Sequence, residues 1–195
     1  MAVTVEQEPA SSILTAERPL EIEIDREVIL DSEGGFRAVR PMPTGITYVV
    51  RGTSLAWERL DLSAMNVADP GPDGARYLDA AGLSQPYRDL AGQWSAAAGT
   101  PWLKAVAIAG TMRTGFKYRR QLTFSEREDG VDIVDCFLGE RKAGSCVNFA
   151  TALVLMLRAI GVPARLAIGY LGHDYDQARG EWRLNASEGH AWGEV

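Results

Sequence analysis

The sequence predicts an α+β fold, in which a small β-rich segment precedes helices and a final set of antiparallel strands. Three observations predict this class. Residues 20–30 (LEIEIDREVIL) alternate apolar and polar side chains, the period of two that is typical of a half-buried strand. Residues 146–160 form an apolar segment with helix-start and helix-stop residues at its ends. Short strand-like segments, among them ARLAIGY and HAWGEV, follow that helix.

Composition limits the classes of function. The chain of 195 residues suits one domain, or one domain with an appendage. Its 20 basic and 26 acidic residues give a net charge of −6, which argues against nucleic acid or an anionic membrane surface as a partner. No apolar run approaches the ~20 residues that cross a bilayer, and residues 1–14 lack the features of a signal peptide. The sequence therefore predicts no membrane segment in this chain.

Turn-forming residues divide the chain into three parts. Residues 1–19 are polar and carry few order signals, so we expect a flexible lead-in. Residues 20–68 form a β-rich appendage, with Leu20, Ile22 and Ile24 on one strand face and a second strand around residues 46–50. The turn-rich DPGPDG at residues 69–74 marks the boundary, and residues 75–195 form the core.

Two helices open the core. An apolar stripe from Tyr87 to Ala98 follows Pro86, which suits a first helical turn. Thr100 and Pro101 are typical of an N-cap and first position, so a second helix is expected to run from there through Met112. The segment TGFKYRRQLTF then breaks the helical period and is expected to be extended.

The central helix is predicted at residues 146–160. Ser145 is a good N-cap, Gly161 suits the position after the helix, and Pro163 prevents continuation. The helix is apolar almost all round, with one face made by Phe149, Leu153, Met156, Leu157 and Ile160. Such a helix is expected at the centre of the core. The strands that follow place Leu166, Ile168 and Tyr170 on one face.

Cys146 lies in the first turn of this helix. A thiol there is close to the positive end of the helix dipole, which favours the thiolate that a nucleophile needs. A free cysteine can also fill core space as a small hydrophobe, so the position alone does not decide its role. His190, at the start of a predicted strand, is the candidate base, whereas His173 lies in a Gly- and Asp-rich loop. One cysteine and one histidine are by themselves a weak signal.

The motifs from residue 143 onward are more specific. The segments GSCVNFATALVLMLRAIGVPARLAIGY and GHAWGEV resemble the core of the bacterial transglutaminase-like superfamily, most closely its extracytoplasmic domains in membrane-anchored proteins. The resemblance extends faintly upstream to about residue 40, through YLD, FKY and DCFL. The matching positions are Gly144, Cys146, Phe149, Ala150, Leu157, Arg158, Gly161, Pro163, Ala164, Arg165, Gly169, Tyr170, His190, Ala191, Trp192, Glu194 and Val195.

The resemblance implies a papain-like core with a catalytic triad, in which Cys146 is the nucleophile and His190 its base. The third member, an Asp on the next strand, has no motif match here, and Glu194 belongs to the HAWGEV motif instead. The sequence stops within a predicted strand, so we expect a domain that is incomplete at its C-terminus and weakly active or inactive. The Cys146 backbone N–H and Tyr118 are the candidate oxyanion donors.

The implied reaction is acyl transfer on an amide of a protein or peptide, through a thioester that a primary amine or water resolves. The alternative is a degenerate module of the same fold that binds a protein or cell-wall partner without chemistry, because the third triad residue is missing and the flank of Cys146 departs from the family at Ser145, Val147 and Asn148. The resemblance also implies a periplasmic or extracellular location in a membrane-anchored parent. It implies no cofactor.

Several other residues have simpler structural explanations. Arg158 and Arg165 are expected to pair with Asp or Glu, Cys136 is expected to be a core thiol, and Trp182 and Trp192 to pack in the core or its wall. HDYD at residues 173–176 offers oxygen ligands without fixed spacing, so no metal site is predicted.

Overall fold

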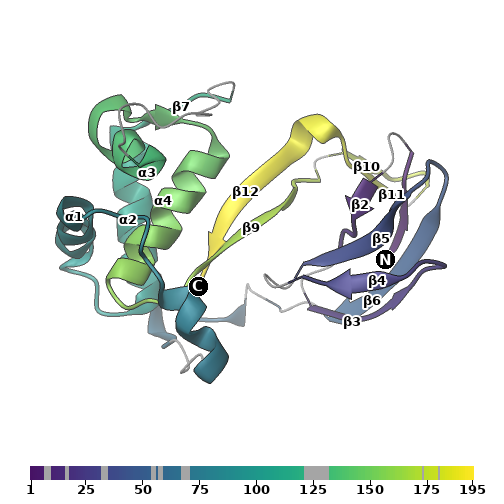
Figure 1. The fold of residues 1–195 in the computed structure, drawn as a ribbon, viewed down its shortest axis with the longest axis horizontal. Coiled ribbons are helices and arrows are strands. Elements are labelled where there is room, and N and C mark those ends of the chain that lie inside the picture. Colours follow the sequence, from purple (N-terminus) through teal and green to yellow (C-terminus); the bar gives the residue numbers. More distant parts are fainter. Residues whose placement is uncertain are drawn as a thin grey trace. The chain divides into compact units, whose positions relative to one another are not determined.

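The computed structural model divides the chain into two compact units, residues 1–60 and 61–195 (Figure 1). It describes residues 1–6, 10–15, 18–31, 35–53, 56, 59–66, 71–120, 132–172, 174–179 and 181–195. The division lies at Leu60 and Asp61, earlier than the turn-rich segment 69–74 that the sequence suggests. Each unit has its own hydrophobic core.

The first unit consists of two three-stranded antiparallel sheets. One has the order β1-β6-β3, and the other β2-β5-β4. The strands are β1 (Ala2–Thr4), β2 (Ala10–Ser12), β3 (Arg18–Glu23), β4 (Val28–Leu30), β5 (Phe36–Met42) and β6 (Thr47–Thr53). The expected flexible lead-in at residues 1–19 is therefore wrong for β1 and β2, which gain order by pairing with the longer β6 and β5.

β3 contains a bulge, so the residues on its inner face differ from those predicted. Pro19 pairs with Gly52 and Glu21 with Arg51, so Leu20 is the extra residue between them. Leu20 is 76% exposed instead of sharing the inner face with Ile22. The inner core of the unit contains Met42, Tyr48 and Val50. The Tyr48 hydroxyl accepts a hydrogen bond from the Leu14 N–H at 2.8 Å and donates to the Leu14 carbonyl at 3.3 Å.

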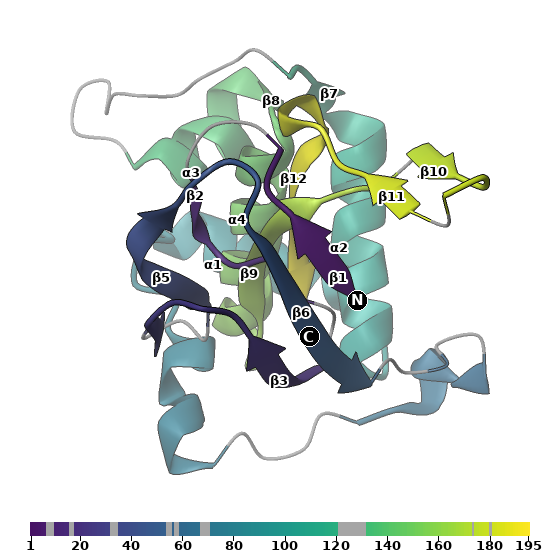
Figure 2. The same cartoon turned by 90° about the vertical axis from the view of Figure 1, so that its right-hand side faces the viewer.

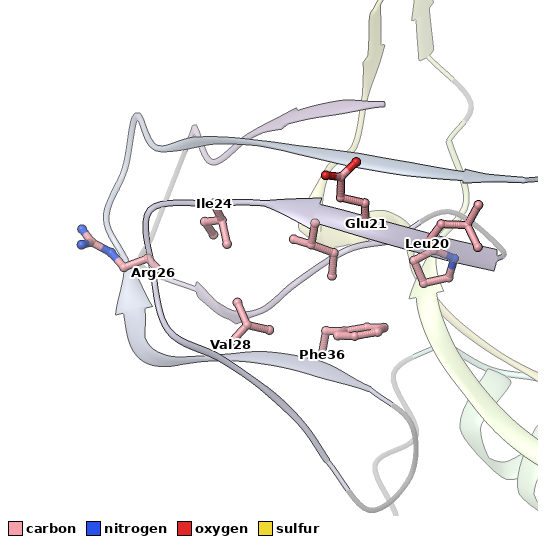
Figure 3. Close-up of a pocket in the computed structure, with 8 residues that line it drawn as sticks. Leu20, Glu21, Ile24, Arg26, Val28 and Phe36 are labelled. Carbon is pink, nitrogen blue, oxygen red and sulfur yellow. The ribbon is translucent and has the colours of Figure 1, made fainter.

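An open pocket of about 280 Å³ lies in the first unit between β3 and the strands that carry Val28 and Phe36. Figure 3 shows Val28 and Phe36 pointing toward the strand with Leu20 and Glu21. Every lining residue belongs to residues 19–36, so the pocket contains none of the predicted catalytic residues. We therefore regard it as the open edge between the two sheets.

The second unit contains the predicted helices. α1 (Gln85–Ser95) and α2 (Pro101–Gly115) form where the sequence predicts helices, and Thr100 Oγ1 accepts a hydrogen bond from the Leu103 N–H at 3.4 Å, as expected of an N-cap. α2 runs past the predicted end at Met112, so Thr114 and Gly115 are helical instead of extended. The other helical segments are η2 (Leu62–Ala64), η3 (Pro72–Leu78), α3 (Ile133–Cys136), the π-helical η4 (Phe137–Arg141), α4 (Cys146–Ala159) and η5 (Ala186–Glu188). None of the helices in the described residues is both long and apolar enough to cross a membrane.

α4 is the central helix, as predicted. Met156 and Leu157 are completely buried, and Phe149, Leu153 and Ile160 pack against the same core. The helix ends with Gly161 at φ 77°, where the Gly161 N–H donates to the Arg158 carbonyl and the Val162 N–H to the Leu157 carbonyl. This pair of bonds is a Schellman motif, and it stops the helix where the sequence indicates.

The strands after α4 form two antiparallel pairs. β9 (Arg165–Tyr170) pairs with β12 (Gly189–Glu194), while β10 (Asp174–Asp176) and β11 (Glu181–Arg183) form a separate hairpin (Figure 2). Leu166, Ile168 and Tyr170 alternate as predicted, but this face is exposed, and Ile168 is 74% accessible. The reason is that α4 packs mainly on β12 and leaves β9 largely uncovered.

Candidate functional site

Cys146 is the first residue of α4, and its side chain is half-buried. Asn148 holds the turn in front of it: Asn148 Oδ1 accepts hydrogen bonds from the Ser145 N–H at 3.0 Å and from Ser145 Oγ at 3.2 Å. Gly144 is needed because an added Cβ would lie 2.8 Å from the Asn148 side chain. The first turn is thereby fixed, and the thiol remains partly accessible at the positive end of the helix.

Tyr118 is the neighbour of this thiol. The short strands β7 (Lys117–Tyr118) and β8 (Ala143–Gly144) pair in parallel and place Tyr118 opposite Gly144. The Lys117 N–H donates to the Lys142 carbonyl and the Arg119 N–H to the Gly144 carbonyl, both at 2.8 Å. These bonds hold the phenol beside the first turn of α4.

The contact with Cys146 changes the acidity of the phenol. Burial contributes most to raising the pKa of Tyr118, followed by the negative charge of the Cys146 sulfur. The positive charge of Arg120 and the Cys146 backbone act in the opposite direction, because both favour the phenolate. The hydroxyl therefore retains its proton at neutral pH and can act as a hydrogen-bond donor.

Aromatic rings pack against Tyr118 and the first turn of α4. The Phe149 ring, one turn after Cys146, lies 6.2 Å from the Tyr118 ring and 5.0 Å from the Phe137 ring, measured between centroids. Phe116 stacks on the same group, 5.1 Å from Phe137. Phe149, three residues after Cys146, therefore connects the first turn of α4 to the core.

His190 is the second residue of β12, where it pairs with Gly169. β12 packs on α4 through Gly193, whose added Cβ would lie 3.3 Å from Val154 and 3.4 Å from Leu153. Figure 1 shows α4 and β12 running in the same direction. Along β12, His190 lies about 10 Å before Gly193. Along α4, Cys146 lies roughly 11 Å before the residues that Gly193 contacts. Both residues are therefore at the same end of the packed pair.

The two side chains are not joined in this structure. Alternation along β12 places Ala191 and Gly193 on the face toward α4 and His190 on the other face, with Trp192 and Glu194. Within the described part of the chain, no hydrogen bond connects the His190 imidazole to the Cys146 thiol. Their pairing as nucleophile and base stays a prediction.

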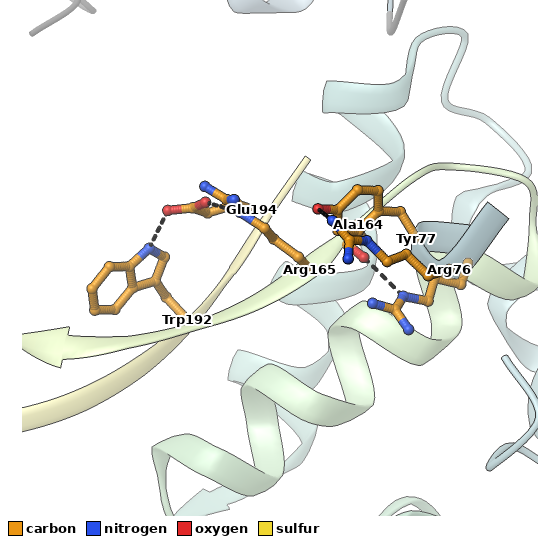
Figure 4. Close-up of polar contacts among 7 residues, drawn as sticks. Arg76, Tyr77, Ala164, Arg165, Trp192 and Glu194 are labelled. Carbon is orange, nitrogen blue, oxygen red and sulfur yellow. Dashed lines mark hydrogen bonds and ion pairs between the residues drawn. The ribbon is translucent and has the colours of Figure 1, made fainter. Parts of the chain in front are cut away.

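Glu194 has structural partners. Its Oε2 lies 2.7 Å from Arg165 Nε, and its Oε1 accepts a hydrogen bond from Trp192 Nε1 at 3.1 Å (Figure 4). The carboxylate raises the pKa of Arg165, while partial burial acts in the opposite direction. The expected acidic partner of Arg165 is thus confirmed, and it is the carboxylate of the HAWGEV segment.

The remaining candidate residues either have structural roles or lie outside the residues that the structure describes. Arg158 donates to two carbonyls, those of Ala164 at 2.8 Å and Asp79 at 3.1 Å, and among the described residues it has no carboxylate partner of the kind that the sequence suggested. Cys136 is half-buried, and both it and Cys146 are free thiols. His173 and the Asp174 side chain lie outside the described residues, within which no cluster of metal-ligating side chains occurs.

Comparison with known proteins identifies the family. The model of the Transglutaminase-like superfamily matches residues 88–195, more than half of the chain. The chain belongs to the transglutaminase-like superfamily. The matched range contains α4, both strands of the β9–β12 pair, Cys146 and His190.

Two curated relatives match parts of this transglutaminase-like chain. Protein-glutamine gamma-glutamyltransferase of Pseudomonas aeruginosa is 38% identical over 63 residues, and the uncharacterized protein YebA of Bacillus subtilis is 40% identical over 68 residues. The matches cover 32% and 33% of this chain and 9% of each relative. The transglutaminase-like chain therefore aligns with only a small part of each longer relative.

The same fold occurs in a solved structure, that of the periplasmic domain of TgpA from Pseudomonas aeruginosa. The TM-score is 0.67 at 23% identity, over 98% of this chain and 63% of that one. Together with the family match, this likeness confirms the α+β, papain-like and transglutaminase-like fold predicted from the sequence.

Sequence reasoning predicted the helix that carries Cys146, whose role as the nucleophile stays a prediction, but it left the contact between Tyr118 and Cys146 undetermined. The only signal was the FKY segment, whose distance from Cys146 in the chain hides the β7–β8 pairing. An acidic partner was expected for Arg165, but Glu194 was not named as that partner, and its hydrogen bond with Trp192 was missed although residues 192 and 194 must share a strand face.

Proposed function

We propose that this chain performs cysteine-dependent acyl transfer on amide substrates, with Cys146 as the nucleophile. The observation that carries the proposal is the placement of Cys146: it is the first residue of α4, partly accessible, with the protonated Tyr118 phenol beside it. Membership of the transglutaminase-like superfamily supports the same role.

In the proposed reaction the Cys146 thiolate adds to the carbonyl carbon of an amide. A C–S bond forms and the carbonyl electron pair moves to oxygen. Collapse of this intermediate breaks the C–N bond, the leaving amine takes up a proton from the imidazolium of His190, and a thioester remains. A primary amine or water then attacks the thioester, which gives transglutamination or hydrolysis.

His190 is the proposed base, and the strand position is compatible with this role. It lies at the same end of the α4–β12 pair as Cys146, and catalytic hydrogen bonds are often long in the absence of substrate. The family's orienting Asp has no match in these residues. Loss of the orienting carboxylate in the analogous serine triad costs about 10⁴ in kcat, so we expect this chain to acylate slowly and turn over weakly.

The proposed substrates are amide groups of proteins or peptides, with a primary amine as a possible acceptor besides water. The glutamyltransferase name of one relative supports a glutamine side chain as donor, although the two chains share only a short aligned segment. The fold likeness to a periplasmic domain supports an extracytoplasmic location in a larger protein.

A second candidate function is a non-catalytic module that binds a protein or cell-wall partner. It is favoured by one observation: His190 points from the strand face opposite to α4 and makes no hydrogen bond to Cys146 in the described residues. Under this proposal Cys146 would react no faster than an ordinary half-buried thiol.

Acylation by p-nitrophenyl acetate separates the two proposals. The purified chain is treated with the ester near pH 7.5, and the acetylated cysteine is located by mass spectrometry. We expect acetyl-Cys146 to form faster than acetyl-Cys136 in the same molecule, and Cys146→Ala to abolish the fast phase while Cys136→Ala preserves it. His190→Ala should slow the fast phase. Equal, slow labelling of both cysteines would contradict the enzymatic proposal and favour the binding module.

A further inference from the structure

We propose that Asn148 is a positioning residue of the candidate active site: its neutral side-chain amide holds the turn in front of Cys146 and places no negative charge beside the reactive sulfur. The inference rests on the proposed function, because it takes Cys146 as the nucleophile. It adds a residue outside the proposed pair of Cys146 and His190, and this residue acts on the reaction only through the sulfur.

The Asn148 side chain is fixed against the two residues before Cys146. Its Oδ1 accepts hydrogen bonds from the Ser145 N–H at 3.0 Å and from Ser145 Oγ at 3.2 Å, and the bond to the N–H is one half of a capping box. A Cβ added at Gly144 would lie 2.8 Å from Asn148 Oδ1, so the amide packs closely on this backbone. The Gly144 carbonyl in turn accepts from the Arg119 N–H at 2.8 Å. The amide therefore connects the first turn of α4 to β8.

The first turn of α4 lacks the carboxylate that helix stability alone would favour. The third helical position of a capping box is typically Glu or Gln, and a negative charge in the first turn interacts favourably with the helix dipole. α4 has Asn148 at this position and no acidic residue in its first turn. A carboxylate there would oppose the ionisation of Cys146, because like charges disfavour each other. The neutral amide supplies the acceptor and leaves the positive end of the helix to the sulfur.

The charged and titratable groups around the thiol come from three other segments. Tyr118 of β7 contacts Cys146, and Arg120 interacts with the same phenol. Lys142 immediately precedes β8, and His190 lies at the same end of β12 as the thiol. A change at residue 148 alters none of them, so a change in the reactivity of Cys146 can be attributed to that residue.

Asn148→Asp keeps the acceptor and adds a charge. We expect alkylation of Cys146 by iodoacetamide at pH 7 and low ionic strength to slow by about tenfold, because the carboxylate lowers the thiolate fraction. The midpoint of the pH–rate profile should move to higher pH. Most of the effect should disappear in ~1 M salt, where the screening length is only ~3 Å. The melting temperature should stay equal or rise, because a carboxylate in the first turn favours the helix.

Asn66→Asp is the matched control. Asn66 is exposed and lies shortly after Ser63, whose carbonyl accepts a hydrogen bond from Thr100 Oγ1 at the start of α2. The other end of α2, which leads to Tyr118, is roughly 22 Å away along the helix. The control adds the same charge far from Cys146, so the alkylation rate and its pH profile should not change.

Asn148→Ala tests the hydrogen bonds. Ala has a higher helix propensity than Asn, so the variant should stay folded while Ser145 loses its partner. Addition to a carbonyl needs an oriented sulfur, whereas displacement of iodide from iodoacetamide needs mainly an accessible thiolate. We therefore expect acylation of Cys146 by p-nitrophenyl acetate to fall by about tenfold or more, and alkylation by less than about threefold. Asn148→Gln, which keeps a neutral acceptor, should restore the acylation rate.

The same measurements identify each way of failing. Unchanged alkylation in Asn148→Asp, or a fall that persists in high salt, would overturn the inference, because the charge at residue 148 would then not act on the sulfur. Unchanged acylation in Asn148→Ala would overturn it as well. Absence of acetyl-Cys146 in the unmodified chain would instead refute the proposed function, whereas the alkylation rates depend only on the thiol. The melting temperature of each variant verifies that it is folded.

Discussion

Glu194 accepts hydrogen bonds from Arg165 and Trp192, which hold its carboxylate on the face of β12 that also carries His190. A carboxylate near a histidine invites assignment as the third triad member. Its two partners instead link the outer faces of β9 and β12, and the ion pair is partly exposed to solvent. The structural role is therefore sufficient to explain it.

Glu194→Gln tests this distinction. Exposed ion pairs contribute about 0–1 kcal/mol, so we expect the free energy of unfolding to fall by less than about 1 kcal/mol in urea denaturation. The acylation rate at Cys146 should stay within about twofold, because Gln keeps an acceptor for Trp192. A loss approaching 10⁴-fold would instead place Glu194 in the orienting role.

Helix α4 shows what local chemistry determines at the scale of an element. Ser145, Gly161 and Pro163 fixed both ends in the prediction, and the structure agrees to within one residue. β9 shows the opposite case. The prediction correctly placed its apolar side chains on one face, but it did not anticipate that this face is exposed. Which face a neighbour covers depends on tertiary packing, which a periodicity of two does not contain.

The end of α4 provides a sharp element-scale prediction. Gly161 has φ 77°, a conformation that costs an L residue roughly 1–2 kcal/mol. Gly161→Ala should therefore lower the free energy of unfolding of the second unit by about that amount, measured by urea denaturation. Gly110→Ala is the matched control: Gly110 lies inside α2 with open space around its Cβ position, so this change should be neutral or stabilising. Equal effects of the two changes would contradict the assignment.

At the scale of the molecule, the two units have separate cores that share no residue. The sequence indicated three parts, and it missed β1 and β2 because strands of only three residues are too short to show a period. They are ordered only by long-range pairing with β6 and β5. The contact of Tyr118 with Cys146 is likewise a product of pairing between distant segments, and no local pattern contains it.

Separate cores predict two unfolding transitions in differential scanning calorimetry. The smaller first unit should melt at the lower temperature, because small domains bury a smaller share of their surface. Tyr48→Phe, which leaves the Leu14 amide groups without their partner, should lower only the first transition. Leu157→Ala, at a completely buried position, should cost about 2–5 kcal/mol and lower only the second. A single transition that shifts with both variants would show that the units unfold together.

The proximity of Tyr118 to Cys146 also links an optical property to chemistry. Part of the resistance of this phenol to ionisation comes from the charge on the neighbouring sulfur, which raises the pKa of Tyr118. A neutral thioester carries no such charge, so acylation makes that ring easier to ionise in alkaline solution. Acylation of Cys146 should therefore change the pH at which the near-ultraviolet absorption of Tyr118 shifts, and no added label is needed to follow it.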